Sequence, residues 1–285
     1  MLKRVLVIGA GVMGSGIAQV AAESGYDVSL MDTRQEFVSK GLAGIEKRLD
    51  SRIKKGNLQE TDKKAILSRI KSTLDIKEAG TADLVIEAIP EVLELKLKTF
   101  KELDNICPEH TILASNTSAL PISAMAAATS AGRQAKVIGI HFMNPVPVMK
   151  GVEVIVGRHT SDETLQTSKE FVKSLGKEPC EAMDYAGFIV SRIIDAMMNE
   201  AFACVMDGNK PEQVDKAMKL CCNFPMGPLE LCDLAGADIV LHGLETLHKE
   251  FGERLRPSPL LVSMVRSGDL GRKTGRGFYD YTAQK

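Results

Sequence analysis

A glycine-rich turn between a strand and a helix constrains this chain more than any other feature. The apolar run Val5–Ile8 predicts a buried strand, and Gly9–Gly14 follows it directly with the spacing G-x-G-x-x-G. Alone the spacing is weak evidence, but here it lies in the required context. Gly9 permits a tight turn, Gly11 lets the backbone approach a pyrophosphate, and Gly14 allows close packing of helix on strand. The pattern therefore predicts a dinucleotide site at a helix N-terminus.

The next predicted strand ends at an acidic residue, Asp32, eighteen residues after Gly14. A carboxylate there binds both hydroxyls of an adenosine ribose and repels a 2′-phosphate, so we expect NAD rather than NADP. Arg34 is close enough to weaken that discrimination. FAD bound by the same loop, and a turn without a ligand, are the alternatives. The residues predicted to bind the dinucleotide here are Gly9, Gly11, Val12, Met13, Gly14 and Asp32.

Through the first half of the chain, short β-branched runs alternate with amphipathic helical patterns. This alternation predicts an α/β fold, a Rossmann-type doubly wound sheet that is mostly parallel and has helices on both faces. A further helix is expected to begin at the capping box Thr160–Glu163 and to end near Leu175, before Gly176. The predicted strands are Arg4–Ile8, Asp27–Met31, Leu84–Ala88, Thr111–Ala114, Val137–Phe142 and Val152–Val156, and the first helices are Val12–Ser24 and Glu36–Lys54.

After Gly187 the pattern becomes helical, and no strand is predicted. We expect a dinucleotide-binding domain over residues 1–185 and an all-α C-terminal domain over residues 186–285. Pro211–Leu220 and Gly236–Phe251 are two of its helices. Its first helix carries two adjacent apolar rows, a stripe wider than one partner face needs. This stripe is interpreted either as core within the domain or as a helical dimer interface. The rows are Ile189, Ile193, Met197 and Ala201, and Val190, Ile194, Met198 and Phe202.

Composition excludes several classes of protein. With 36 Lys+Arg and 37 Asp+Glu, the net charge of -1 gives no drive toward nucleic acid or an anionic membrane. Gly9–Gly11 interrupts the first apolar run too early for a signal peptide, and Ile189–Met206 contains charged residues, so neither predicts a membrane segment. We expect a cytoplasmic protein. The cysteines lack C-x-x-C or zinc-finger spacing, so reduced core thiols and no metal are predicted for Cys107, Cys180, Cys204, Cys221, Cys222 and Cys232.

Candidate catalytic residues follow two of the predicted strands. Ser115–Ser118 comes after one, His141 ends another, and Glu153 lies twelve residues later, close enough for the chain to fold back. A carboxylate beside a histidine fixes its tautomer for general acid–base work. His141 would take the proton of an alcohol while hydride leaves the carbon that bears the hydroxyl. Ser118 would form a hydrogen bond with the reacting oxygen. A hydrolase triad of Ser118, His141 and Glu153 is less favoured, because no G-x-S-x-G surrounds the serine.

These residues together resemble the L-3-hydroxyacyl-CoA dehydrogenases, most closely the short bacterial 3-hydroxybutyryl-CoA dehydrogenases. The resemblance covers nearly the whole chain, and the histidine motif and the terminal glycine motif are far more specific than the first glycine loop. The motifs that carry it are Gly9–Gly14, Asp32, Ser115–Ser118, His141–Pro147, Pro225–Pro228 and Lys273–Tyr279.

The resemblance implies an NAD-linked interconversion of a (S)-3-hydroxyacyl-CoA and a 3-ketoacyl-CoA, of the kind used in fatty-acid and butyrate metabolism. It also implies a homodimer formed by the helical domain. His141 matches the family's acid–base histidine, and Glu153 matches the glutamate that holds this histidine. Ser118 matches a serine that contacts the substrate. The other carried-over residues are Glu91 and Lys96 at the nicotinamide-side ribose, Asn116, Asn144 and Lys273 at the cofactor, and Lys54 and Lys55 at the CoA phosphates.

Two positions depart from the family pattern. Ser191 stands where the family usually has Asn near the substrate oxygen, and its shorter side chain reaches less far. We place Ser191 in the site, where loss of an amide donor costs on the order of 10²-fold in rate if that donor stabilises developing charge. Gly151 replaces a usual Leu and is expected to loosen the strand carrying Glu153. The rival interpretations are an enzyme for a free hydroxy acid or sugar acid, and an NAD-binding protein without turnover.

Overall fold

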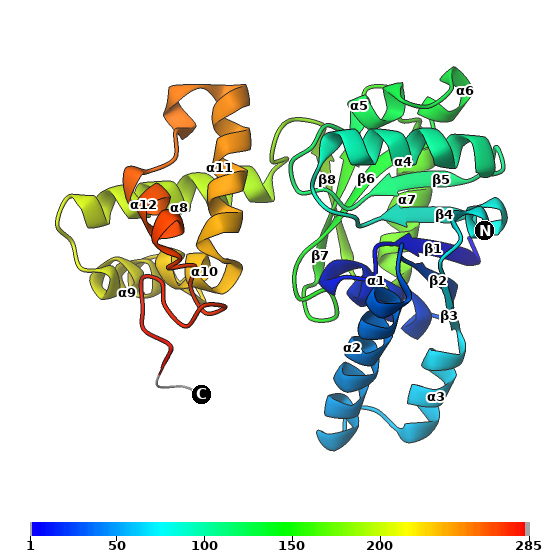
Figure 1. Ribbon diagram of the computed structural model, residues 1–285, viewed down its shortest axis with the longest axis horizontal. Coiled ribbons are helices and arrows are strands. Elements are labelled where there is room, and N and C mark those ends of the chain that lie inside the picture. The colour runs from blue at the N-terminus through cyan, green and yellow to red at the C-terminus, as the bar shows by residue number, and fades with distance from the viewer. Residues whose placement is uncertain (1, 283–285) are drawn as a thin grey trace. The chain divides into compact units, whose positions relative to one another are not determined.

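The structure is a computed structural model that describes residues 2–282. The chain divides into two compact units, with the division between Asp184 and Tyr185. The N-terminal unit is built on one sheet and the C-terminal unit on helices (Figure 1). Each unit is described below by itself.

The N-terminal unit contains an eight-stranded sheet in the order β3-β2-β1-β4-β5-β6-β7-β8. Neighbouring strands run parallel except β6 and β7, which are antiparallel. This confirms the predicted Rossmann-type sheet. The strands are β1 Arg4–Ile8, β2 Asp27–Met31, β3 Ile70–Thr73, β4 Leu84–Glu87, β5 Ile112–Ser115, β6 Val137–Phe142, β7 Gly151–Val156 and β8 Glu178–Met183.

The six predicted strands are present to within a residue or so at each end, whereas β3 and β8 were not predicted. These two strands form the edges of the sheet. Their sequences, Ile-Lys-Ser-Thr and Glu-Pro-Cys-Glu-Ala-Met, are mostly exposed or half-buried. Edge strands need no continuous apolar run, so hydrophobic patterning does not reveal them.

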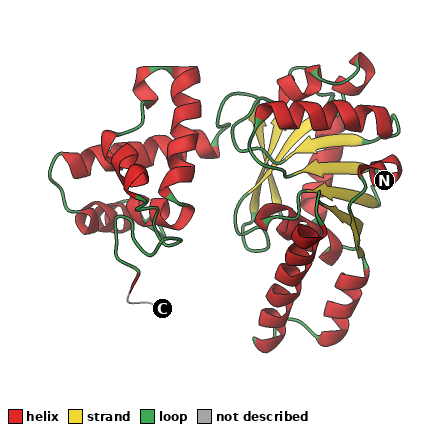
Figure 2. Ribbon diagram, in the orientation of Figure 1, coloured by secondary structure: helices red, strands yellow, loops and turns green. Residues whose placement is uncertain are grey.

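Helices lie on both sides of this sheet (Figure 2). Ile17 of α1 and Phe171 of α7 pack in one core cluster with Val7 and Leu30 of the strands. Figure 1 shows α2 and α3 as a helical pair that extends away from the sheet. The helices of this unit are α1 Val12–Glu23, α2 Gln35–Lys54, α3 Glu60–Ser68, η1 Ile76–Thr81, α4 Leu93–Ile106, α5 Ile122–Ala127, α6 Ala131–Gln134 and α7 Asp162–Ser174.

The predicted cap of α7 is wrong by one residue. Ser161 is the N-cap, and its hydroxyl accepts a hydrogen bond from Thr164 N at 3.2 Å. The Thr160 hydroxyl is occupied elsewhere, because it donates to Val137 O at 2.6 Å and accepts from Gly157 N at 3.0 Å. The threonine thus holds the end of β7 against β6, which leaves capping to the next residue.

The C-terminal unit is helical, as predicted: beyond Gly187 the described residues form helices and two isolated bridges. Its core is formed by α8, α10, α11 and α12, with Met198, Phe202, Leu229, Leu244 and Leu261 among its residues. The helices are α8 Val190–Met206, α9 Pro211–Cys221, α10 Pro228–Ala235, α11 Ala237–Phe251, η2 Glu253–Leu255 and α12 Pro259–Ser267.

The apolar stripe of α8 is core over only part of its length. Met198, Ala201 and Phe202, in its C-terminal half, are buried. Ile193 is 62% exposed and Ile189, just before the helix, is 45% exposed. The interpretation of the whole stripe as core is therefore wrong at its N-terminal end, where the other helices of the unit do not cover it.

The cysteines correct another expectation. All six are free thiols, but only Cys107 and Cys232 lie in the core, and Cys180, Cys221 and Cys222 are exposed. The exposed thiols belong to edge strand β8 and to the C-terminal end of α9, where side chains face outward. Burial raises the pKa of the Cys107 thiol to about 11, which makes it unreactive. Within residues 2–282, the structure has no helix long and apolar enough to cross a membrane.

Candidate active site

The order of strands places the first glycine loop at a crevice. β1 lies between β2 and β4, so the connections after β1 and β4 depart in opposite directions at the carboxyl edge of the sheet. Ligands of open α/β sheets bind at such a switch point. Gly9, Gly11, Val12 and Met13 line a cleft of about 720 Å³ there, together with Met31, Asp32, Phe37, Pro90 and Thr99.

Each glycine of the loop meets a different steric requirement. Gly9 has a positive φ of 101°, and a Cβ on it would overlap the carbonyl of Ala88. A Cβ on Gly14 would overlap the carbonyl oxygen of Gly9. Gly11, in contrast, has nothing within 4 Å of its absent Cβ. The first two glycines are needed by the fold itself, whereas the space beside Gly11 is open to a ligand.

The cleft has the features that a dinucleotide requires. Gly11 is the N-cap of α1, and within the described residues no side chain caps that helix. Its first N–H groups therefore suit a pyrophosphate. Asp32 Oδ2 accepts a hydrogen bond from Ala10 N at 2.8 Å, and Oδ1 accepts from Thr33 N at 2.7 Å, so the carboxylate is held beside the glycine loop. These residues fit a nicotinamide dinucleotide.

The structure brings His141 and Glu153 together. They are direct partners in the antiparallel pairing of β6 and β7, so their side chains leave the same face of the sheet. His141 Nδ1 lies 2.8 Å from Glu153 Oε2, and both side chains are buried. A carboxylate at Nδ1 holds the ring in one orientation and keeps a proton on that nitrogen. Nε2 is then the atom through which the imidazole exchanges a proton.

The loop after β5 lies next to this pair. Ser115 and Gly139 are partners in the parallel pairing of β5 and β6, so Asn116–Ser118 and His141 leave the same edge of the sheet. Asn116 Oδ1 accepts a hydrogen bond from Phe142 N at 2.9 Å, which ties the loop to the residue after His141. Ser118 itself is exposed. The structure thus places an accessible hydroxyl in the loop that follows β5, the strand adjacent to the one carrying His141.

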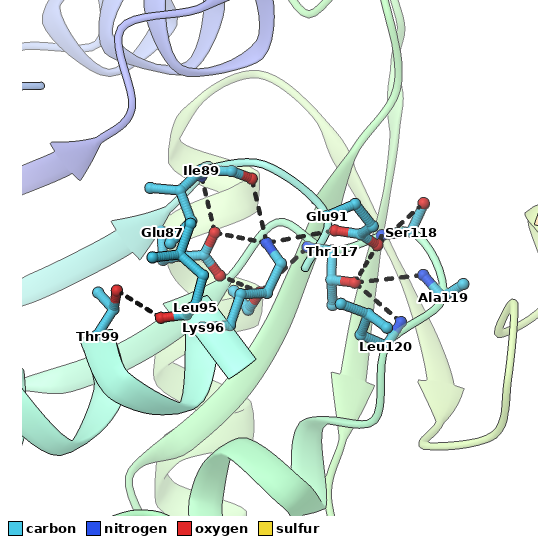
Figure 3. Close-up of polar contacts among 11 residues, drawn as sticks. Glu87, Ile89, Glu91, Leu95, Lys96, Thr99, Thr117, Ser118, Ala119 and Leu120 are labelled. Carbon is cyan, nitrogen blue, oxygen red and sulfur yellow. Dashed lines mark hydrogen bonds and ion pairs between the residues drawn. The ribbon is translucent and has the colours of Figure 1, made fainter. Parts of the chain in front are cut away.

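Glu91 holds this loop in place (Figure 3). Its Oε1 accepts hydrogen bonds from the Thr117 hydroxyl, from Ser118 N at 3.0 Å and from Ser118 Oγ at 3.3 Å. Burial alone raises the pKa of the Glu91 carboxyl. The Lys96 ammonium and the hydrogen bonds from Thr117 and Ser118 outweigh burial and leave that pKa below its ordinary value. Glu91 is therefore a carboxylate at neutral pH.

Lys96 lies between two carboxylates, those of Glu87 and Glu91 (Figure 3). Its side chain is 1% exposed, and Nζ lies 2.6 Å from Glu87 Oε1 and 3.3 Å from Glu91 Oε2. Sequence reasoning identified Lys96 and Glu91 but missed Glu87. The available signal was an acid within the otherwise apolar run Leu84–Ala88, at the carboxyl end of a predicted strand.

Four basic residues lie in the last turns of α2 and just after it, namely Arg48, Arg52, Lys54 and Lys55, and they form two pairs with different surroundings. Arg48 donates to Gln19 Oε1 at 2.6 Å and Arg52 pairs with Glu23 at 2.7 Å, so both tie α2 to α1. Lys54 and Lys55 are exposed, and neither forms an ion pair within residues 2–282. Only the two lysines are available to a ligand.

The remaining predicted residues are Asn144, Ser191 and Lys273. Asn144 is exposed in the loop after β6. Ser191, in the first turn of α8, is half-buried. Lys273 forms an ion pair with Asp238 in the first turn of α11.

The terminal glycine motif is folded onto two buried aspartates. Asp233 accepts hydrogen bonds from Phe278 N and Tyr279 N, each at 3.0 Å, and Asp215 accepts from the Tyr279 hydroxyl at 2.7 Å. Phe278 stacks on Phe202 of α8. Phe278 and Tyr279 therefore close the helical core, whereas Lys273, Thr274 and Arg276 of the motif are exposed.

Comparison with known proteins agrees with this geometry. Residues 4–185 match the family model for the NAD binding domain of 3-hydroxyacyl-CoA dehydrogenase, and residues 187–281 match the model for its C-terminal domain. Together the two matches cover nearly the whole chain. The chain therefore belongs to the 3-hydroxyacyl-CoA dehydrogenase family.

Full-length relatives support the assignment. The chain is 46% identical over 280 residues to the 3-hydroxybutyryl-CoA dehydrogenase of Clostridioides difficile, covering 98% of this chain and 99% of that one. It is 43% identical to the human mitochondrial hydroxyacyl-coenzyme A dehydrogenase, covering 99% and 92%. Among solved structures, the (S)-3-hydroxybutyryl-CoA dehydrogenase of Ralstonia eutropha superposes with a TM-score of 0.94 at 45% identity, covering 99% of this chain and 100% of that one.

Proposed function

We propose that this protein interconverts a (S)-3-hydroxyacyl-CoA and the corresponding 3-ketoacyl-CoA with NAD(H), and that its substrates are short acyl chains such as 3-hydroxybutyryl-CoA. The observation that carries the proposal is the buried His141–Glu153 pair, one strand away from the Ser118 hydroxyl and at the same edge of the sheet as the dinucleotide cleft. The relatives named above act on this class of substrate.

In the oxidative direction, His141 removes the proton of the substrate hydroxyl through Nε2. Glu153 keeps the ring oriented and stabilises the imidazolium that results. With substrate bound, the Ser118 hydroxyl would turn its proton from Glu91 Oε1 to the same substrate oxygen as it becomes a carbonyl, while Ser118 N stays hydrogen-bonded to Glu91. When bound, the nicotinamide supplies the hydride acceptor for this chemistry. In the reductive direction, His141 returns the proton to the carbonyl oxygen.

The dinucleotide would lie along the cleft lined by Asp32 and Pro90 and extend beyond it toward Glu91. Asp32 would bind the adenosine ribose hydroxyls and favour NAD over NADP, because a 2′-phosphate would meet its negative charge. The N-terminus of α1, at Gly11–Met13, would hold the pyrophosphate. Glu91, Asn116, Asn144 and Lys273 are proposed at the nicotinamide side.

We propose that Lys54, Lys55 and Ser191 contact the acyl-CoA. Lys54 and Lys55 are exposed cations suited to the CoA phosphates. Ser191 is proposed near the substrate carbonyl or hydroxyl, through a bridging water where its side chain is too short. We further propose a homodimer formed by the helical unit, supported by exposed Ile193, and a cytoplasmic location in fatty-acid or butyrate metabolism.

The test is NADH oxidation by the purified full-length protein with acetoacetyl-CoA, with NADPH and with free acetoacetate in parallel reactions. We expect turnover with NADH and acetoacetyl-CoA, and much slower turnover when either component is replaced. Equal turnover of free acetoacetate would favour a hydroxy-acid dehydrogenase. NADH binding without turnover of any of these substrates would contradict the proposal.

A further inference from the structure

The buried carboxylate of Glu87 has no part in the roles described above, yet it contacts Ile89, Lys96 and Ser115, which belong to three segments near the Ser118 loop. We propose that Glu87 is a positioning residue for the reaction: through Lys96 it orients Glu91, and through Ser115 it fixes the loop that carries Ser118. This inference rests on the proposed function.

Glu87 is the last residue of β4, and its side chain is 0% exposed. Oε1 accepts hydrogen bonds from Ile89 N at 2.8 Å and from Lys96 Nζ at 2.6 Å. Oε2 accepts from Ser115 Oγ at 2.6 Å. One carboxylate therefore joins the segment after β4, helix α4 and the end of β5. Desolvating such an ion pair is costly, and apolar side chains often stabilise a fold as well, so packing alone does not explain it.

Lys96 links Glu87 to Glu91. Its ammonium donates hydrogen bonds to Glu87 Oε1 at 2.6 Å and to the carbonyl of Ile89 at 3.3 Å, and it forms an ion pair with Glu91 Oε2 at 3.3 Å (Figure 3). The Lys96 side chain is 1% exposed, so these protein groups fix the position of its ammonium. Lys96 thus carries the effect of Glu87 to Glu91.

Glu91 in turn positions Ser118 through hydrogen bonds. Its Oε2 faces Lys96, while its Oε1 holds the backbone N–H and the hydroxyl of Ser118. The opposite side of the same loop is fixed by Ser115, whose hydroxyl accepts from Thr117 N at 3.2 Å while donating to Glu87. The position of the Ser118 hydroxyl thus depends on Glu87 along two routes.

Charge makes the first route sensitive to Glu87. Two carboxylates, Glu87 and Glu91, share the single ammonium of Lys96. If Glu87 becomes neutral, the ammonium is attracted more strongly to Glu91, and Glu91 Oε1 moves away from Ser118. A displacement of this kind in a positioning group lowers the rate of the chemical step more than it weakens substrate binding.

The experiment compares Glu87→Gln with Thr111→Val. Thr111 donates a buried hydrogen bond to Ala82 O at 2.6 Å, at the opposite end of the sheet, just before β5 begins. Kinetics with acetoacetyl-CoA, NADH affinity by fluorescence titration and thermal unfolding are measured for both variants. We expect Glu87→Gln to lower kcat by about tenfold or more, with a smaller change in KM and weaker NADH binding. Thr111→Val should lower the unfolding midpoint and leave kcat and NADH affinity unchanged.

A second comparison tests whether Glu87 acts through Lys96. In the Lys96→Met background, adding Glu87→Gln should change NADH affinity by less than about twofold, because the ammonium that transmits the effect is absent. Independent, multiplicative effects of the two substitutions would overturn the Lys96 route.

Two outcomes overturn the proposal as a whole. One is a Glu87→Gln variant that is less stable but has the kcat and NADH affinity of the wild type. If this variant does not fold, Ser115→Ala takes its place, and it must lower kcat without a matching loss of stability; an unchanged kcat overturns the proposal. Failure of the proposed function is seen separately, because the wild-type protein would then not reduce acetoacetyl-CoA, while NADH titration would still report on Glu87.

Discussion

Each unit carries a glycine-rich signature, and the glycines of the two signatures serve different purposes. In the N-terminal unit, the space where Gly11 lacks a Cβ is open, within a cleft lined by Asp32. In the C-terminal unit, the corresponding space at Gly277 is filled by the carboxylate of Asp233 and lies 2.7 Å from Gly271 Cα. The first signature prepares a surface for a ligand, and the second closes a core.

This difference shows that the specificity of a motif for a family is not evidence that its residues bind a ligand. The terminal motif is far more diagnostic than G-x-G-x-x-G, but its Phe278 and Tyr279 are held by Asp233 and packed inside the unit. Close packing and buried hydrogen bonds of this kind restrict which residues a position tolerates, as a catalytic role does. Substitutions in each unit can test the distinction.

The largest effect is expected from Gly277→Ala. The added methyl group would overlap Asp233 Oδ1 and displace the carboxylate that binds the tail. We expect the free energy of unfolding to fall by about 3 kcal/mol, measured by urea denaturation. Gly132→Ala is the control, because nothing lies within 4 Å of that position and its φ is not positive. A Gly277→Ala variant as stable as this control would refute a structural role for the motif.

The helical unit should also respond to pH through Asp195. Burial raises the pKa of this carboxyl to about 7, and it fills the space beside Gly243 of α11. The folded chain then binds more protons than the unfolded chain between about pH 4 and pH 7, so stability falls as pH rises through that window. Asp195→Asn should flatten this fall in thermal unfolding. Asp207→Asn, at the exposed C-cap of the same helix, should preserve it.

A smaller effect, on binding alone, is expected from Gly11→Ala. The methyl group enters open space, so stability should change by about 1 kcal/mol or less. NADH affinity should fall about tenfold or more, because the methyl group occupies the path by which a pyrophosphate approaches the backbone. Fluorescence titration and urea denaturation measure the two quantities. Unchanged affinity would mean that the cleft binds its ligand elsewhere.

The smallest effect is expected from Ser191→Asn. This substitution tests whether a residue of the helical unit contributes to the reaction as well as to the structure. A longer side chain with an amide donor should raise kcat with acetoacetyl-CoA several-fold, since it would stabilise developing charge on the substrate oxygen. Steady-state kinetics suffice, with Ser191→Ala as the matched variant. A lower kcat for Ser191→Asn would show that the pocket is built around serine.

Much of this organisation could be predicted from the sequence, because local patterns encode it. The strand before Gly9, the acid at Asp32 and the change to helical periodicity after Gly187 all follow from short-range rules. Edge strands β3 and β8 were not predicted, because exposed polar strands lack the apolar pattern that marks a buried strand. The N-cap at Ser161 was not predicted, because a tertiary hydrogen bond from Thr160 to Val137 O keeps the Thr160 hydroxyl from capping the helix.

The candidate site shows the same limit. His141 and Glu153 are separated by a short hairpin, so their proximity can be inferred from spacing. Glu87, Ser115 and Lys96 meet only through the pairing of β4 with β5 and the packing of α4. No spacing rule reveals such a cluster, although a charged residue within a buried strand marks where to look.

The most direct test of the account is the activity of His141→Ala. If His141 exchanges the substrate proton, NADH-dependent reduction of acetoacetyl-CoA should fall by about 10³-fold, while NADH affinity by fluorescence titration stays unchanged. The exposed His159→Ala is the control and should retain full activity. A His141→Ala variant with activity comparable to this control would contradict the assignment of the His141–Glu153 pair as the acid–base centre.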